Sequence, residues 1–142
     1  MPKSLQDELR LSLRNDLLEL PAACAAAEAY LAQRGVEPWT RSVLALALEE
    51  VVSNVIRHGY DDGARHEIAV ALRLVGEEVE LDVVDDGREF DPRASPDVDL
   101  RAPLDARRAG GLGVHLLRTM VRELRYERVG DQNHLRVLVG AR

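Results

Sequence analysis

The sequence has a single cysteine, fewer basic than acidic residues, and no long apolar run. Cys24, on its own, cannot form a disulfide framework or a metal cluster. No apolar run approaches the length of a membrane span, and the first residues show neither the charged nor the apolar region of a signal peptide. We therefore expect a soluble, cytoplasmic protein with no membrane partner.

The shortage of positive charge argues against direct nucleic-acid binding. The chain carries 19 lysine and arginine residues against 25 aspartate and glutamate residues, a formal net charge of -6 with an isoelectric point near 5.2. A phosphate backbone is bound mainly by clustered positive charge, so no direct nucleic-acid partner is expected. With 142 residues, 46% of them hydrophobic, the chain can form one domain over residues 1–142 with its own core.

Hydrophobic periodicity predicts both strands and helices along the chain. Runs that alternate at period two indicate strands, and strong helix formers between proline and glycine indicate helices. The expected strands lie at 9–13, in a hairpin over 67–84, and at 124–129 and 134–139 around a turn at 130–133. The expected helices lie at 22–34, from a cap at Thr40 to His58, and at 114–123. This order predicts an α+β fold, a two-layer sandwich of helices on a mostly antiparallel sheet.

The helix that contains residues 46–60 carries its polar groups on one side. One narrow arc of this helix holds Glu50, Ser53, Asn54 and Arg57. The helix is expected to be buried all round at its start and to open onto a polar site near its end. The alternative is that Glu50 and Asn54 form a hydrogen-bonded edge of the core without further function.

Asp85-Asp86-Gly87 follows the second strand of the expected hairpin. The Asp85 carboxylate could accept a hydrogen bond from an exocyclic amine such as that of adenine. Gly87 would let the backbone approach a flat ring closely. An Asp-Asp-Gly sequence is also typical of an ordinary turn, which is the competing interpretation.

Four residues, Gly110, Gly111, Leu112 and Gly113, directly precede the third expected helix. Unpaired backbone N–H groups and the positive end of the helix dipole make such a junction suitable for phosphate. The alternative is a flexible hinge.

These residues close a lid loop of about residues 87–109, in which the hydrophobic periodicity disappears. A loop this long is usually functional or disordered. Its arginines could fold over phosphates or remain solvated: Arg101, Arg107 and Arg108.

Together these features predict an ATP site without a P-loop or protein-kinase signature. Mg²⁺ prefers oxygen ligands, so the Asn54 side-chain carbonyl and the phosphates would form a reasonable coordination shell. Glu50, one helical turn earlier, would face the γ-phosphate and could orient or deprotonate an attacking hydroxyl.

Three stretches of the sequence resemble one known superfamily. EEVVSNVIRHGY resembles the N-box, VVDDGREFDP the first glycine box, and GGLGVHLLRTMV the second glycine box of the gyrase, Hsp90, histidine-kinase and MutL (GHKL) ATPases, which have the Bergerat fold. Within it the chain is most similar to the RsbW and SpoIIAB group of anti-sigma factor serine kinases. One departure is Glu89, which stands where the first glycine box has its second glycine.

The resemblance implies a single histidine-kinase-like ATPase domain and a role for each matching residue. Glu50 would be the catalytic base, Asn54 the magnesium ligand and Asp85 the adenine acceptor. The backbone positions that would bind nucleotide are Gly87, Gly110, Gly111, Leu112 and Gly113.

The function implied by the resemblance is that of an ATP- and Mg²⁺-dependent serine/threonine kinase that regulates transcription by partner switching. It would phosphorylate a STAS-domain anti-anti-sigma protein and sequester a sigma factor, and it could form a homodimer. One alternative is a nucleotide-sensing protein that binds its partner without transferring phosphate. Another is an ATP-hydrolysing domain without a protein substrate.

Overall fold

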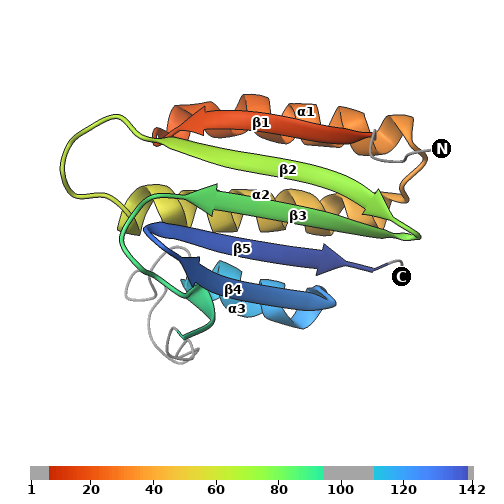
Figure 1. The fold of residues 1–142 in the computed structure, drawn as a ribbon. Helices are drawn as coiled ribbons and strands as arrows, with labels where there is room; N and C mark the ends of the chain where they lie inside the picture. Colours follow the sequence, from red (N-terminus) through yellow and green to blue (C-terminus); the bar gives the residue numbers. More distant parts are fainter. Residues whose placement is uncertain (1–6, 95–110, 141–142) are drawn as a thin grey trace.

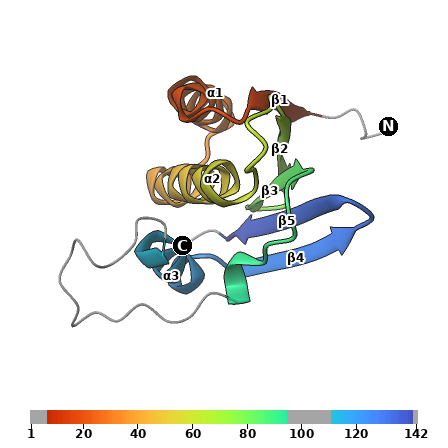
Figure 2. The same cartoon turned by 90° about the vertical axis from the view of Figure 1, so that its left-hand side faces the viewer.

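The computed structural model describes residues 7–94 and 111–140 and shows helices on one face of a five-stranded antiparallel sheet (Figures 1 and 2). The strands are β1 (Glu8–Arg14), β2 (Glu67–Val75), β3 (Glu78–Asp85), β4 (Glu123–Val129) and β5 (Gln132–Val139). The helices are α1 (Leu20–Gln33), α2 (Pro38–His58) and α3 (Gly111–Met120), with short 3-10 turns η2 (Leu17–Glu19) and η3 (Pro92–Ala94). The predicted α+β sandwich is confirmed.

The sheet has the strand order β1-β2-β3-β5-β4, and every neighbouring pair is antiparallel. β3 and β5 are therefore adjacent in the middle of the sheet although the whole of α3 separates them in sequence. In Figure 2 the three helices lie side by side on one face, with α2 between α1 and α3. This arrangement brings the end of α2, the end of β3 and the start of β5 to the same edge of the molecule (Figure 1).

The core lies between the helices and the inward faces of the strands. Its largest fully buried side chains include Leu44, Leu48, Leu72, Leu81 and Val137. The prediction that α2 is buried all round at its start is wrong, because Ser42 and Glu49 are exposed. In Figure 2, α1, α3 and the sheet flank α2 on three sides, and no described helix or strand lies on the fourth.

Two helix boundaries differ from the predictions. α2 begins at Pro38 with Glu37 as its N-cap residue, so Thr40 does not cap the helix; its hydroxyl is buried and donates to Glu37 Oε1 at 3.3 Å. Proline is tolerated in the first helical turn because its missing N–H has no partner there. α3 ends at Met120 and not at Glu123, because the Arg122 N–H pairs with Leu138 O at 2.8 Å and the chain enters the sheet.

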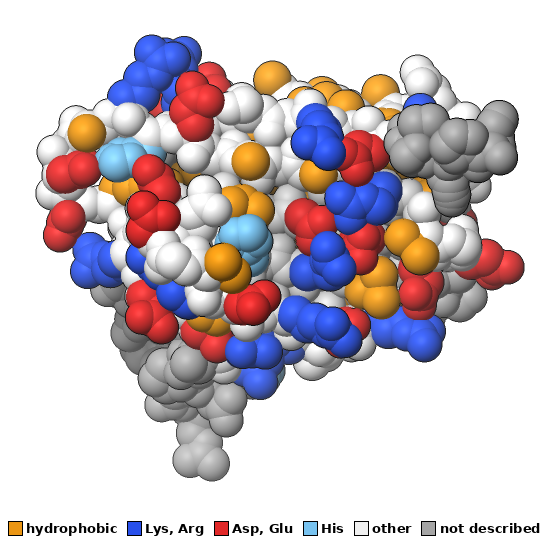
Figure 3. Space-filling model, in the orientation of Figure 1, with side chains coloured by type: hydrophobic (Ala, Val, Ile, Leu, Met, Phe, Trp, Pro, Cys, Tyr) orange, Lys and Arg blue, Asp and Glu red, His pale blue; other side chains and the backbone are white. Residues whose placement is uncertain are grey.

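The other face of the sheet is open and charged (Figure 3). Arg73 on β2 forms ion pairs with Glu8, Glu80 and Asp82 on the neighbouring strands β1 and β3. Arg136 on β5 also pairs with Asp82, with 2.7 Å between Nε and Oδ1. Alternation of apolar and charged residues is expected when only one face of an antiparallel sheet is covered. Among the described helices, none has the length and apolar character needed to cross a membrane.

Candidate nucleotide site

The predicted site residues gather where α2, β3 and β5 end or begin and where α3 starts. Two of them, Asn54 and Asp85, line a small cavity of about 20 Å³, which has room for about one water molecule. The residues around it come from α2, β3, β4, β5 and the segment after β3: Val51, Asn54, Val55, Val83, Asp85, Phe90, Pro92, Tyr126, Asn133 and Leu135. A purine ring would therefore fit only if side chains of this lining moved, among them Phe90 and Pro92 of the lid loop.

Asp85 is the last residue of β3, and its side chain points inward to the helices. The residue is 5% exposed, and its Oδ1 accepts hydrogen bonds from the Gly87 N–H at 2.8 Å and from Asn133 Nδ2 at 2.9 Å. Its Oδ2 makes no hydrogen bond with any residue that the structure describes. One oxygen is thus held by the protein and the other is available to an external donor such as an amine.

The adjacent Asp86 points away from this cavity. Its carboxylate accepts from the Tyr60 hydroxyl at 3.2 Å and lies 3.3 Å from Nδ1 of His66, which stacks on the Tyr60 ring. A hydrogen bond with Asp62 raises the pKa of His66, with Asp86 adding to the effect. The two aspartates of the Asp-Asp-Gly sequence therefore have different surroundings, and only Asp85 belongs to the cavity.

Gly87 lies against the end of α2. A Cβ atom at this position would lie 2.7 Å from the carbonyl oxygen of Gly59, and the same oxygen accepts from the Arg88 N–H at 2.9 Å. Backbone packing between the N-box and the first glycine box thus requires a glycine here. Close approach of Gly87 to a nucleotide ring stays a prediction.

Gly87→Ala is expected to destabilise the fold by about 1–3 kcal/mol, because the added Cβ would clash with the backbone carbonyl of Gly59, which cannot rotate away. Urea unfolding of the apoprotein measures the effect. Gly140→Ala is the matched control, since its added Cβ would meet its nearest atoms at 3.5 Å, an ordinary contact. Equal stability of the two variants would contradict a steric role for Gly87.

Glu50 and Asn54 lie one turn apart on the side of α2 that faces the start of α3. Asn54 is 6% exposed, and its side chain makes no hydrogen bond within the described part of the chain. Glu50 Oε1 is buried and has no hydrogen-bond partner in the described structure. Burial raises the pKa of Glu50, the charge of Glu49 adds to the increase, and Arg57 opposes it. A buried carboxylate oxygen without a hydrogen-bond partner costs free energy, so its presence calls for a functional explanation.

The second glycine box forms the beginning of α3, which starts at Gly111 and not at the predicted Val114. Gly111 and Gly113 consequently lie in the first turn, where backbone N–H groups have no partner inside the helix. A Cβ on Gly113 would lie 1.9 Å from Glu50 Oε1, so this glycine makes room for the carboxylate. Gly110, the side chain of Leu112 and the lid arginines lie outside the described residues.

Glu89 replaces a glycine of the first glycine box without occupying the cavity. Its side chain is exposed, and the adjacent Phe90 lines the cavity and stacks on His58 with a ring-centroid distance of 5.5 Å. The substitution therefore adds charge at the entrance to the lid loop and takes no volume from the cavity.

Asn133 is a site residue that the sequence analysis missed, because residues 130–133 were expected to form a turn. In the structure β5 begins at Gln132, and Asn133 pairs with Asp85 across the β3–β5 ladder. The observed turn is shorter than the predicted one: it contains only Gly130, which has a φ of 62°, and Asp131. A prediction of this two-residue turn would have placed Asn133 in the strand.

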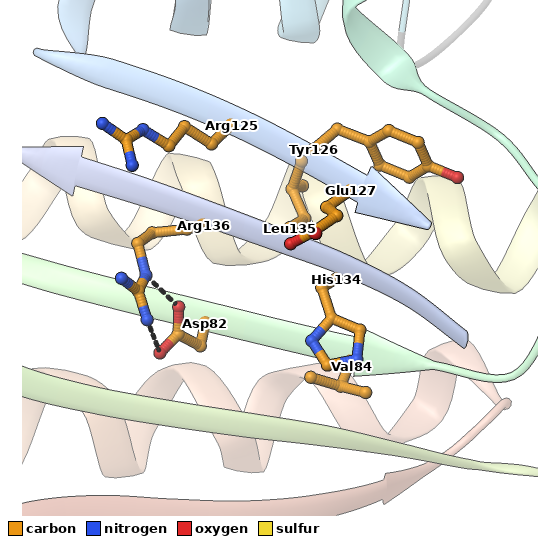
Figure 4. Close-up of a pocket in the computed structure, with 8 residues that line it drawn as sticks. All are labelled: Asp82, Val84, Arg125, Tyr126, Glu127, His134, Leu135 and Arg136. Atoms are coloured by element: carbon orange, nitrogen blue, oxygen red, sulfur yellow. Dashed lines mark hydrogen bonds and ion pairs between the residues drawn. The ribbon is translucent and has the colours of Figure 1, made fainter. Parts of the chain in front are cut away.

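A separate cavity of about 280 Å³ lies on the open face of the sheet, away from the predicted site residues (Figure 4). Charged side chains dominate its lining, and the Arg136 guanidinium pairs with the Asp82 carboxylate. Because these charges neutralise one another, we assign no chemistry to this cavity.

Comparison with known proteins gives a consistent family. Residues 13–139 match the model of the histidine kinase-like ATPase domain. The chain is 31% identical to the serine/threonine-protein kinase BtrW of Bordetella bronchiseptica over 134 residues, 88% of this chain and 93% of BtrW. It is 29% identical to the serine-protein kinase RsbW of Bacillus subtilis over 100 residues, 68% of this chain and 59% of RsbW, so the match spans less than two thirds of RsbW.

One solved structure supports the fold. The RsbU and RsbW domains of Rv1364c from Mycobacterium tuberculosis align with a TM-score of 0.69 at 19% identity, covering 95% of this chain and 32% of that one. At this identity the similarity concerns the fold alone.

Proposed function

Since the chain belongs to the histidine kinase-like ATPase domain family, we propose that it is an ATP-dependent serine/threonine protein kinase. The observation that carries the proposal is the pair formed by Glu50 and Asn54. Glu50 has a buried carboxylate oxygen without a hydrogen-bond partner in the described structure, and Asn54 is a largely buried polar residue that lines the cavity. A buried carboxylate oxygen without a partner, one turn from a polar residue that lines a cavity, is suited to bind a ligand and to act on it.

The proposed roles follow from the chemistry of each group. Asp85 Oδ2 accepts a hydrogen bond from the amine of adenine, and the N-terminus of α3 binds phosphate oxygens through its backbone N–H groups. Asn54 supplies an oxygen ligand to Mg²⁺, an ion that neutralises phosphate charge when bound. Glu50 accepts the proton of the attacking serine or threonine hydroxyl; its raised pKa makes it a better proton acceptor than an ordinary carboxylate.

We further propose that the phosphoryl acceptor is a STAS-domain anti-anti-sigma protein and that the kinase sequesters a sigma factor in the cytoplasm. The kinase names of BtrW and RsbW and the resemblance of the three boxes to the RsbW group support this partner class. Incubation with labelled ATP and candidate STAS proteins tests it. ATP binding without transfer to any of them would favour a nucleotide-sensing binding protein, and turnover without any partner would favour a simple ATPase.

Asp85→Asn is expected to weaken ATP and ADP binding by about 1–3 kcal/mol, because a charged acceptor is replaced by a neutral one. Calorimetric titration in the presence of Mg²⁺ measures the change. Asp86→Asn is the matched control: it makes the same substitution next in sequence, but Asp86 faces Tyr60 and His66. Equal affinities in the two variants would remove Asp85 as the adenine acceptor, and no binding by the unmodified protein would reject the nucleotide site.

A further inference from the structure

Asn133 holds a central position in the hydrogen bonding around Asp85. The two residues are register partners on β3 and β5, and both side chains point to the helix-covered face. Asn133 is 5% exposed and is one of the few buried polar residues of the described core. Since it lies beside the proposed adenine acceptor, its contacts determine how that acceptor is presented.

The amide group of Asn133 has partners at both ends. Nδ2 donates to Asp85 Oδ1 at 2.9 Å and to Arg88 O at 2.9 Å, with Gly87 O at 3.5 Å. Oδ1 accepts from the Tyr126 hydroxyl and from Arg128 Nη1, the latter at 3.1 Å. An arginine can only donate and a backbone carbonyl can only accept, so these partners allow one orientation of the amide.

This orientation fixes the carboxylate of Asp85. Its Oδ1 is held by two donors, the Gly87 N–H and Asn133 Nδ2, and both would be lost if the carboxylate rotated. The oxygen that remains, Oδ2, therefore keeps one direction. A fixed acceptor in a buried site discriminates strongly against ligands that lack the matching donor, because the acceptor is then left unpaired.

We propose, on the basis of the nucleotide-binding function proposed above, that Asn133 is a positioning residue that sets the selectivity of the site for a 6-amino purine. It acts through Asp85 and does not touch the phosphates. Its bond to Arg88 O and the bond from Arg128 Nη1 to Gly87 O at 2.8 Å also fasten the start of the lid loop to β4 and β5. The base end of the site is thereby preorganised by residues from three strands.

The test compares three ligands in the presence of Mg²⁺: ATP, purine riboside 5′-triphosphate, which lacks the amine, and inorganic tripolyphosphate. The unmodified protein is expected to bind ATP at least about tenfold more tightly than the purine analogue. In Asn133→Ala the affinity for ATP is expected to fall about tenfold, while the affinities for the other two ligands change less than about twofold. The ratio of ATP to analogue affinity therefore approaches one.

Two further variants separate positioning from a general effect on folding. His134→Ala changes the next residue of β5, whose side chain lies on the open face, and should leave all three affinities unchanged. Tyr126→Phe removes one donor to Asn133 Oδ1 and should lower the ratio by about twofold to threefold; it decides the question alone if Asn133→Ala does not fold.

Equal weakening of all three ligands, or an unchanged affinity ratio in both Asn133→Ala and Tyr126→Phe, would overturn the inference. So would an unmodified protein that binds ATP and the purine analogue equally. A protein that binds none of the three ligands would instead reject the proposed nucleotide site itself, so the two failures are distinguishable.

Discussion

Glu50→Gln is expected to lower single-turnover phosphoryl transfer by about 10²–10⁴-fold, the usual contribution of a general base. Glutamine keeps the size and hydrogen-bonding capacity of glutamate but cannot accept the proton of an attacking hydroxyl. ATP affinity should stay within about twofold, because the proposed nucleotide contacts are made by Asp85 and the α3 N-terminus and not by Glu50. Transfer from labelled ATP to a STAS substrate and calorimetric titration measure the two effects separately.

The pH profile of phosphoryl transfer tests the proposed role of Glu50 as the base. Transfer requires the deprotonated carboxylate, and burial raises the pKa of Glu50, so transfer should fall with decreasing pH at higher values than for an ordinary glutamate. The negative charge of Glu49 contributes to this increase. The control Glu49→Gln should retain transfer and move the acid limb to lower pH. Unchanged transfer in Glu50→Gln would reject Glu50 as the base.

The sequence predicted the fold well because most strands alternate clearly. The two faces of β2 and β3 are read directly from the inward Val70, Leu72 and Leu81 and the outward Arg73 and Asp82. A one-residue shift would exchange these faces, which makes the pattern a strong constraint on pairing. The position of the helices on one face then followed from covering the apolar side, whereas the strand order β1-β2-β3-β5-β4 was not predicted and comes from the structure.

The ends of helices and strands were predicted less well, because the same residue type can occur at the end of an element or inside it. Thr40 can cap a helix, yet Pro38 already fits the first turn and α2 starts there. Asn133 suits a turn, yet it lies in β5 and points to Asp85. Asn133 was therefore missed because its proposed role depends on Asp85, a partner that is distant in sequence.

The three boxes are brought together in a way that their spacing alone did not specify. The sequence placed Glu50, Asp85 and Gly113 near ends of elements, and the structure adds that Gly113 packs against Glu50 and that Gly87 packs against Gly59. Both contacts depend on how α2 sits between its neighbours. The glycines thus have steric roles within the protein besides the proposed contacts with nucleotide.

Gly113→Ala is expected to lower phosphoryl transfer by about 10²-fold or more, approaching the loss in Glu50→Gln. The added Cβ would lie 1.9 Å from Glu50 Oε1 and 2.1 Å from its Cδ, so the carboxylate must move. These atoms end a flexible side chain, and the backbone can remain in place. Alanine is also the better helix former, so urea unfolding should show stability equal to or above that of the unmodified protein.

The double variant Gly113→Ala with Glu50→Gln separates displacement of the base from a direct phosphate contact at Gly113. If alanine acts by displacing Glu50, the double variant should lose little more transfer than Glu50→Gln alone, because residues that act as a unit are not additive. ATP affinity should then be similar in all three variants. Multiplicative losses together with weaker ATP binding would show that Gly113 acts on the phosphates and that its proximity to Glu50 is incidental.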